Sequence, residues 1–165
     1  MYEIAYFPSR VGTLEITGSN DGIKSIRIME APVTPAEDIP MVLRPCVQQL
    51  REYFAGRRKV FRLKLDLSDA PPFYRQVWKV VGMIPYGKTR SYSDIAHILD
   101  MPTALRAVGQ ANGHNPIPIV IPCHRVVGKH GDLTGYAYGL EIKRNLLNLE
   151  NPAKYARQGD LFKVN

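Results

Sequence analysis

The residues best suited to covalent chemistry stand side by side in the sequence as Cys123, His124 and Arg125. They end a stretch beginning at Asn115 in which three prolines alternate with branched residues. Because proline fixes φ and restricts the residue before it, this stretch is expected to be extended and stiff. A thiolate is the reactive form of cysteine, and neighbouring cationic or hydrogen-bonding groups lower the pKa of the thiol. The pattern therefore predicts a rigidly held nucleophile at Cys123.

A neighbouring cysteine and histidine, such as Cys123 and His124, also occur in other classes of protein. Neighbours in a straight strand point to opposite faces, so a contact between Cys123 and His124 requires a turn or a bridging water. A papain-like protease is disfavoured because its cysteine and histidine are distant in sequence, and a zinc site because the sequence offers no second ligand pair at metal spacing. Cys46, inside an amphipathic pattern, is interpreted as buried and inert. The other histidines are interpreted as ordinary surface or helix residues: His97, His114 and His130.

Composition and charge narrow the class of protein. With 165 residues, 45% hydrophobic and 22% charged, the chain can form one compact unit or two small lobes. It has no run of about 18 apolar residues and no basic start followed by an apolar run, so membrane spanning and secretion are not expected. Two distant cysteines without a CxxC pair fit a cytoplasmic protein. Residues 71–165 carry a net charge of +6 against +1 for residues 1–70, which favours nucleic acid first, anionic membrane second, or a solvated basic face.

The first 69 residues have the pattern of an α/β scaffold domain. Residues 2–7, 13–17 and 23–28 are rich in branched and aromatic side chains and are separated by turn signals, which predicts a small antiparallel sheet. Apolar residues then recur at helical spacing over residues 43–54. Alternation over residues 61–67 predicts a further strand with one solvated face.

Residues 70–165 have a different pattern, and the prolines around residues 69–72 predict a hinge between two domains. A helix is expected over residues 77–84, and a Ser-x-x-Asp capping box at Ser91 opens a second helix. A third helix, Ala104 to Asn112, is unusually rich in small residues and is expected to be capped by Thr103. Two short helices separated by a turn are typical of a helix-turn-helix, although a generic helical hairpin has the same pattern.

Together these motifs resemble one known family. The chain is similar to the O6-alkylguanine-DNA alkyltransferases, continuously from about residue 72 to Glu150 and more loosely over residues 1–70. The motifs that carry the resemblance are FYRQVW at 73–78, IPYG at 84–87, SYSDIA at 91–96, RAVG at 106–109, NP at 115–116 and IPCHRVV at 121–127. The resemblance implies an N-terminal sheet lobe with a helix, followed by a mainly helical lobe containing a winged-helix-like helix-turn-helix.

The resemblance also implies a reaction and a catalytic set. Cys123 would take an alkyl group from O6 of guanine in DNA and keep it as a thioether, in a single turnover. His124 would act through water as a base toward the thiol, with Glu150 orienting the imidazole. Asn115 would brace the turn, and Tyr92 would donate a proton or hydrogen bond to the leaving guanine.

The DNA contacts and the base pocket are implied in the same way. The partner would be double-stranded DNA containing O6-alkylguanine, bound by a monomer with no metal and no cofactor. Arg106 would fill the gap left by an extruded nucleotide. The rest of the implied DNA-binding set is Ala104, Ala107, Gly109 and Arg125. The implied substrate pocket consists of Pro118, Val126, Tyr136, Ala137, Tyr138 and Lys143.

Some residues depart from the family pattern. Tyr138 stands where many relatives have a small residue, so the pocket rim is expected to be narrow, and Ala137 replaces a frequent serine. Residues 1–42 lack the cysteine and histidine of zinc-binding relatives. The alternative function is a non-catalytic, lesion-binding alkyltransferase-like protein, against which Cys123 itself argues. A Cys-His hydrolase is a third reading, disfavoured because a thioether has no reasonable hydrolytic exit.

Overall fold

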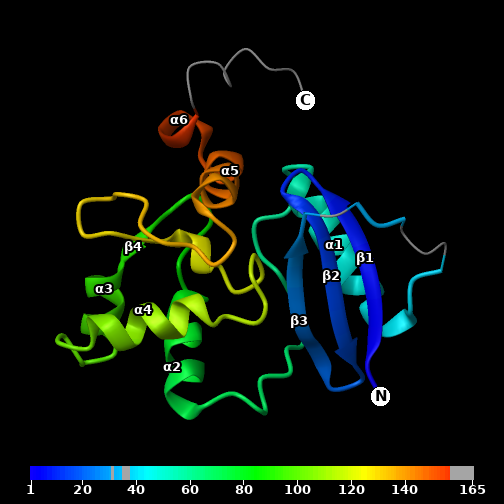
Figure 1. Cartoon of the computed structure of the whole chain (residues 1–165), viewed down its shortest axis with the longest axis horizontal. Helices are drawn as coiled ribbons and strands as arrows, with labels where there is room; N and C mark the ends of the chain where they lie inside the picture. The colour runs from blue at the N-terminus through cyan, green and yellow to red at the C-terminus, as the bar shows by residue number, and fades with distance from the viewer. Residues whose placement is uncertain (31, 35–37, 157–165) are drawn as a thin grey trace.

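The structure is a computed structural model that describes residues 1–30, 32–34 and 38–156. Figure 1 shows a sheet lobe and a helical lobe side by side. The N-terminal lobe contains strands β1 (Glu3–Ser9), β2 (Gly12–Ser19) and β3 (Gly22–Met29), the 3-10 helix η1 (Met41–Leu43) and helix α1 (Arg44–Phe54). The C-terminal lobe contains helices α2 (Pro72–Val81), α3 (Tyr92–Ile98), α4 (Leu105–Gly113), α5 (Leu140–Glu150) and α6 (Pro152–Tyr155), the 3-10 helix η2 (Cys123–Arg125) and the two-residue strands β4 (Arg90–Ser91) and β5 (Val126–Val127). The predicted α/β class, the first three strands and the first helix are confirmed.

The three long strands form an antiparallel sheet in the order β1-β2-β3, with α1 against one face. Leu14, Ile16 and Ile26 point into that face and are fully buried together with Leu50 of α1. Burial of such side chains contributes roughly 1.5 to 3 kcal/mol each, so this layer stabilises the lobe without any polar contact. The sheet is thereby fixed as a platform beside the helical lobe.

The strand predicted over residues 61–67 is wrong. The segment pairs with β3 only at one residue, where Leu65 forms a parallel bridge with Ile23. Earlier in the segment, the side chain of Gln49 takes the place of a partner strand at Arg62: its amide donates to the Arg62 carbonyl at 3.1 Å, and its oxygen accepts from the Arg62 N–H at 2.8 Å. The alternating pattern is real because the segment is extended and covers the core, but a helix side chain satisfies its backbone.

The helix starts in the C-terminal lobe differ in how well they were predicted. The capping box of α3 is confirmed, with the Asp94 N–H donating to Ser91 Oγ at 3.0 Å and the Ser91 N–H donating to Asp94 Oδ2 at 2.9 Å. Thr103 does not cap α4, because the residue at the cap position is Ala104 and no side chain takes part. The helix begins one residue late because the Ala104 N–H already bonds the Met101 carbonyl in the preceding turn.

The two lobes share one hydrophobic core. The cluster of buried side chains runs from the sheet and α1 to α2, α3, α4 and α5. Backbone bonds reinforce it, because the Ile26 N–H of β3 donates to the Pro116 carbonyl at 2.9 Å. A change in one lobe therefore reaches the other through packed side chains. Among the described residues, no helix is both long enough and apolar enough to cross a membrane.

Candidate active site

Cys123 is presented by the short helix η2 at the end of the proline-rich segment. This segment is not extended as predicted: the Ile121 N–H bonds the Ile117 carbonyl at 2.9 Å, and Ile119 has a φ of 75°. The loop folds back because the Asn115 side chain joins its two ends, donating to the Ile121 carbonyl at 2.7 Å and accepting from the Ile117 N–H at 2.9 Å. These bonds close the loop directly before Cys123, and the stiffness expected of the segment stays a prediction.

The Cys123 side chain is only 5% exposed. Its Sγ lies 3.8 Å from the hydroxyl oxygen of Tyr136, and its carbonyl accepts a hydrogen bond from Asn112 Nδ2 at 3.3 Å. Burial raises the pKa of the Cys123 thiol, while hydrogen bonds from Asn115 and Tyr136 and the charge of Lys143 oppose this shift without cancelling it. The resting thiol is therefore protonated, and its reaction requires a base.

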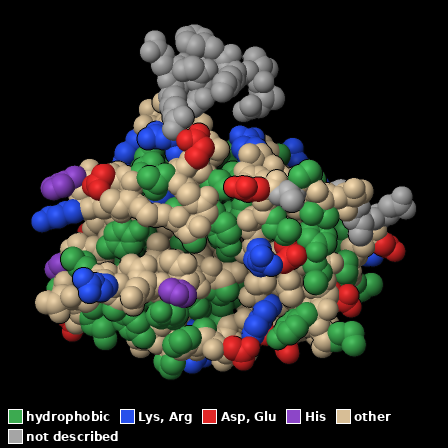
Figure 2. All heavy atoms as spheres, in the orientation of Figure 1, with side chains coloured by type: hydrophobic (Ala, Val, Ile, Leu, Met, Phe, Trp, Pro, Cys, Tyr) green, Lys and Arg blue, Asp and Glu red, His purple; other side chains and the backbone are tan. Residues whose placement is uncertain are grey.

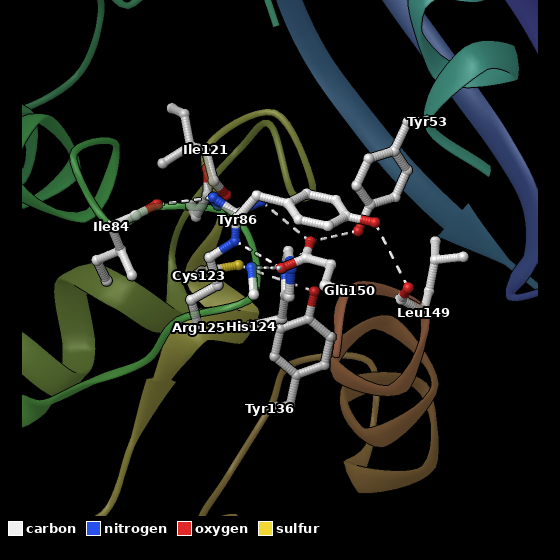
Figure 3. Close-up of polar contacts among 12 residues, drawn as sticks. Tyr53, Ile84, Tyr86, Ile121, Cys123, His124, Arg125, Tyr136, Leu149 and Glu150 are labelled. Atoms are coloured by element: carbon white, nitrogen blue, oxygen red, sulfur yellow. Dashed lines mark hydrogen bonds and ion pairs between the residues drawn. The ribbon is translucent and has the colours of Figure 1, made fainter. Parts of the chain in front are cut away.

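The Glu150 carboxylate, at the end of α5, binds the two residues that follow Cys123, which are His124 and Arg125 (Figure 3). His124 Nε2 lies 2.7 Å from Glu150 Oε2, and Arg125 binds the carboxylate through Nε at 2.8 Å and Nη2 at 3.0 Å. Arg125 Nη1 donates to the Ile84 carbonyl at 2.7 Å. Burial alone would raise the pKa of Glu150, but His124 and Arg125 outweigh it and hold that pKa well below its ordinary value. The carboxylate is therefore ionised although it is buried.

The protonation of Glu150 decides the tautomer of His124. Burial lowers the pKa of His124 despite the nearby carboxylate, so the ring is neutral. An ionised carboxylate can only accept, so Nε2 carries the proton and Nδ1 carries the lone pair. This Nδ1 is buried and has no hydrogen-bond partner among the described residues. The arrangement thus holds an oriented basic nitrogen on the residue next to the thiol.

A cavity of about 220 Å³ opens beside the thiol. This is smaller than the roughly 300 to 1,000 Å³ of pockets for drug-sized ligands, so it suits a compact planar group. It is lined by Tyr92, Gly109, Asn112, Gly113, Asn115, Pro118, Cys123, Gly135, Tyr136, Ala137 and Tyr138. Within the described residues, no group of three or more His, Cys, Asp or Glu side chains could hold a metal ion.

Comparisons with known proteins identify the family. Residues 72–152 match the family described as 6-O-methylguanine DNA methyltransferase, DNA binding domain, and residues 1–67 match the ribonuclease-like domain of the same proteins. The methylated-DNA–protein-cysteine methyltransferase of Mycolicibacterium paratuberculosis is 44% identical over 154 residues, which cover 91% of this chain and 93% of that protein. The chain belongs to the 6-O-methylguanine DNA methyltransferase family.

Solved structures of such methyltransferases have the same fold. The crystal structure of Mycobacterium tuberculosis OGT in complex with DNA has a TM-score of 0.81 and 42% identity, covering 94% of this chain and 95% of that one. A second crystal structure, of M. tuberculosis O6-methylguanine methyltransferase, covers 99% of this chain with the same TM-score and 40% identity. The α/β fold class inferred for this methyltransferase, an N-terminal sheet lobe followed by a mainly helical lobe, is therefore confirmed.

The helix pair α3 and α4 places the residues that the sequence assigned to DNA. Arg106 is exposed on α4, whereas Ala104 and Ala107 are partly exposed and Gly109 lines the cavity. A Cβ atom at Gly109 would meet nothing within 4 Å, so open space lies over this part of the helix. The small-sided face of the methyltransferase thus lies next to its pocket.

Two assignments from the sequence, Arg125 and Lys143, need correction. Arg125 is not available to DNA, because it is buried and both ends of its guanidinium are bound to Glu150 and Ile84. Val126 is fully buried in β5, and the expectation that its backbone borders the base pocket stays a prediction. Lys143 is fully buried and does not line the cavity, because its Nζ donates to the carbonyls of Thr134 at 2.9 Å and Gly135 at 3.2 Å.

Two side chains at the site were missed by the sequence analysis. Asn112 was treated only as the end of a small-sided helix, yet it is buried and lines the cavity. Tyr53 was treated as part of the scaffold lobe, yet its hydroxyl donates to Glu150 Oε2 at 2.5 Å. A polar residue in a helix of small side chains could have indicated the role of Asn112, but no local pattern distinguishes Tyr53.

Proposed function

We propose that this protein repairs DNA by transferring the alkyl group from O6 of guanine to Cys123, where it stays as a thioether. Membership of the methyltransferase family supports the reaction class. The observation that carries the assignment to Cys123 is its position on the wall of the cavity, next to the buried pair of His124 and Glu150. A thioether is not hydrolysed by the site, so each molecule acts once.

The transfer requires a thiolate in a site that holds a protonated thiol. His124 takes the thiol proton at Nδ1 through a water molecule that bridges the thiol and this nitrogen. Glu150 then stabilises the imidazolium through its contact with Nε2. The new bond between Sγ and the alkyl carbon forms as the bond from that carbon to O6 breaks. The electron pair of the broken bond goes to the guanine, which finally gains a proton. Atoms and charges balance without a cofactor.

Tyr92 is placed to assist the leaving guanine. It lines the cavity, and burial raises the pKa of its hydroxyl above the ordinary value of 10.0, so the group stays protonated and able to donate. A donor that strengthens its bond as negative charge develops on the base lowers the barrier. Tyr136 lies against Sγ and closes the other side of the cavity.

The partner is double-stranded DNA containing O6-alkylguanine, bound by a monomer in the cytoplasm. The alkylated oxygen lies within the base stack, so the nucleotide must leave the helix to reach a thiol that is only 5% exposed. Arg106 on α4 fills the gap in the stack, and Ala104, Ala107 and Gly109 allow close approach. Lys and Arg side chains are dispersed among acidic ones on the face shown in Figure 2. The net charge of +6 over residues 71–165 supports attraction to the DNA phosphates.

One labelling experiment tests this function. DNA with a single radiolabelled O6-methylguanine is incubated with the wild-type protein and with the Cys123→Ser variant. We expect one label per wild-type molecule and none on the variant, whose DNA binding stays nearly unchanged. Label that stays on the DNA with the wild type would favour the non-catalytic lesion-binding alternative, and repeated turnover would favour a hydrolase. Labelling of Cys123→Ser would overturn the assignment to Cys123.

A further inference from the structure

The Glu150 carboxylate receives a hydrogen bond from the other lobe of the protein. Tyr53, near the end of α1 and 97 residues away in sequence, donates its hydroxyl to Glu150 Oε2 at 2.5 Å (Figure 3). Oε2 is also the oxygen that lies 2.7 Å from His124 Nε2. The N-terminal lobe therefore touches the same atom as the base of the reaction.

Packing fixes the Tyr53 hydroxyl in this position. The side chain is fully buried, and its ring lies in an aromatic cluster with centroid distances of 5.1 Å to Phe54, 5.4 Å to Phe61 and 6.2 Å to Tyr86. Burial and the nearby Glu150 raise the pKa of Tyr53 well above its ordinary value, so its hydroxyl remains a donor at every pH at which the protein works. A tyrosine held this way cannot leave the carboxylate without opening the lobe interface.

The hydrogen bond from Tyr53 to Glu150 affects the bond between the same carboxylate and His124. A hydrogen bond to an ionised carboxylate spreads the charge and lowers the attraction of that carboxylate for any other proton. With Tyr53 in place, Oε2 holds the Nε2 proton of His124 less strongly than it otherwise would. Removal of the hydroxyl would concentrate the charge on Oε2, stabilise the imidazolium and raise the proton affinity of Nδ1.

We propose that Tyr53 is a positioning residue of the alkyl transfer, which sets the strength of the His124 base by binding Glu150 Oε2 from the N-terminal lobe. This inference rests on the proposed function, in which His124 takes the thiol proton. It also gives the N-terminal lobe a part in the reaction beyond that of a scaffold.

Other charged groups also surround His124 and Glu150, and a substitution at Tyr53 does not remove any of them. Arg125 binds Glu150 from η2, and the charge of Lys143 on α5 lowers the pKa of His124. The ring of Tyr86 lies 5.7 Å from the Arg125 guanidinium and 5.6 Å from Lys59 Nζ. The Tyr86 hydroxyl donates to the Leu149 carbonyl at 3.4 Å and makes no hydrogen bond to Glu150. It is therefore the matched control for Tyr53 in the same cluster.

The test compares Tyr53→Phe with Tyr86→Phe in the full chain. The single-turnover rate of methyl transfer is measured from pH 5 to 9, and the His124 ring is titrated by NMR in the unreacted protein. We expect the acidic limb of the rate profile and the His124 titration of Tyr53→Phe to move to higher pH by about one unit. Tyr86→Phe is expected to leave both at the wild-type pH.

A second variant reverses the sign of the effect. Replacement of Tyr53 alone by 3-fluorotyrosine makes the hydroxyl a stronger donor, so the limb and the titration should move to lower pH. This variant also serves if Tyr53→Phe does not fold. A purely structural role would lower the rate at every pH without moving either midpoint, and that result, or an equal shift in Tyr86→Phe, would overturn the proposal. Wild-type protein that transfers no label would instead contradict the proposed function, while the NMR titration would still report on Tyr53.

Discussion

At the scale of single residues, the reactivity of Cys123 is set by its surroundings. Burial keeps the thiol protonated, and the lone pair on His124 Nδ1 is available only because Glu150 is ionised and fixes the proton on Nε2. The bidentate contact with Arg125 holds Glu150 in that state, since a buried carboxylate otherwise takes up a proton. Arg125 therefore keeps Glu150 ionised, and the ionised Glu150 in turn keeps the basic nitrogen of His124 available.

Tyr138 is expected to limit the size of the adduct. It lines the cavity, and its ring packs edge-on against Tyr136 at a centroid distance of 6.0 Å. Tyr138→Ala should raise the transfer rate for O6-benzylguanine relative to O6-methylguanine by about 10-fold or more, since relieving crowding by a few methylene-sized groups changes discrimination by that much. Tyr138→Phe keeps the bulk and is the control. An unchanged rate ratio in Tyr138→Ala would show that this side chain does not define the rim.

At the scale of elements, α4 is held firmly on one face and is open on the other. Val108 and Ala111 are buried, and the Ala111 carbonyl accepts a hydrogen bond from Trp78 Nε1 of α2 at 2.7 Å. The exposed face carries Arg106 beside residues with small side chains. A short helix clamped this way can be pressed against DNA without shifting the pocket that its C-terminal half lines.

Arg106→Ala is expected to separate extrusion of the base from the chemistry. Only a duplex substrate carries the unstacking cost of a few kcal/mol, so the variant should repair O6-methylguanine in duplex DNA far more slowly but react with free O6-benzylguanine at nearly the wild-type rate. Arg75→Ala, which removes an exposed cation from α2, controls for the loss of charge. An equal loss of rate on both substrates would contradict the proposal that Arg106 fills the gap left by the extruded nucleotide.

At the scale of the whole molecule, the site joins three elements that are distant in the sequence. The Glu150 carboxylate at the end of α5 binds His124 and Arg125 of η2 and Tyr53 of α1. One hydrophobic core underlies all of them. The stability of the protein and the state of its catalytic groups are therefore coupled.

The stability of the protein should fall in acid. The pKa of His124 is lowered from 6.5 and that of Glu150 from 4.5, so the unfolded chain binds protons more readily than the folded one. The His124 contribution is present above pH 6.5 and is lost as pH falls below it, and that of Glu150 is lost below pH 4.5. The free energy of unfolding from urea titrations at pH 7.5, 5.5 and 4 checks this order. A constant value over this range would contradict it.

Glu150→Gln is expected to be strongly destabilising at neutral pH. It leaves the Arg125 guanidinium buried without its counter-charge, which costs about 3 to 5 kcal/mol. Glu52→Gln removes a partly exposed pair, in which Arg58 Nε lies 3.0 Å from Glu52 Oε1, and should cost less than about 1 kcal/mol. Urea titration of both variants at pH 7.5 gives the comparison. Similar losses in the two would mean that the buried carboxylate adds nothing special.

Repair itself should destabilise the protein. A methyl group on Sγ must fit where the thiol already lies 3.8 Å from the Tyr136 hydroxyl, and the resulting thioether can no longer donate. Overpacking of a filled site costs about 1 to 3 kcal/mol, and at this chain size each kcal/mol lowers the melting temperature by roughly 2 to 4 °C. A thermal melt of protein methylated at Cys123 should lie several degrees below that of unreacted protein. A melting temperature that is unchanged or higher would exclude this effect.

The sequence by itself determined the features that are local or carried by contiguous motifs. Strand alternation and the capping box at Ser91 depend on neighbouring residues, so β1 to β3 and α3 could be predicted. The contiguous motifs between residues 73 and 127 indicated the family, and the resemblance implied the reaction and most of the pocket wall.

Only the tertiary structure decided which polar groups meet and which are buried. Arg125 was expected at the DNA surface, yet it is buried on Glu150, and Lys143 was expected in the pocket, yet it is buried on the Thr134 carbonyl. The segment over residues 61–67 has the alternation of a strand, but it pairs with β3 only at Leu65, and the Gln49 side chain bonds the backbone of Arg62. The contact between Tyr53 and Glu150 spans 97 positions and leaves no mark on the local pattern of either residue. Burial of a charge and its pairing are properties of the assembled core, and they depend on which distant segments pack together.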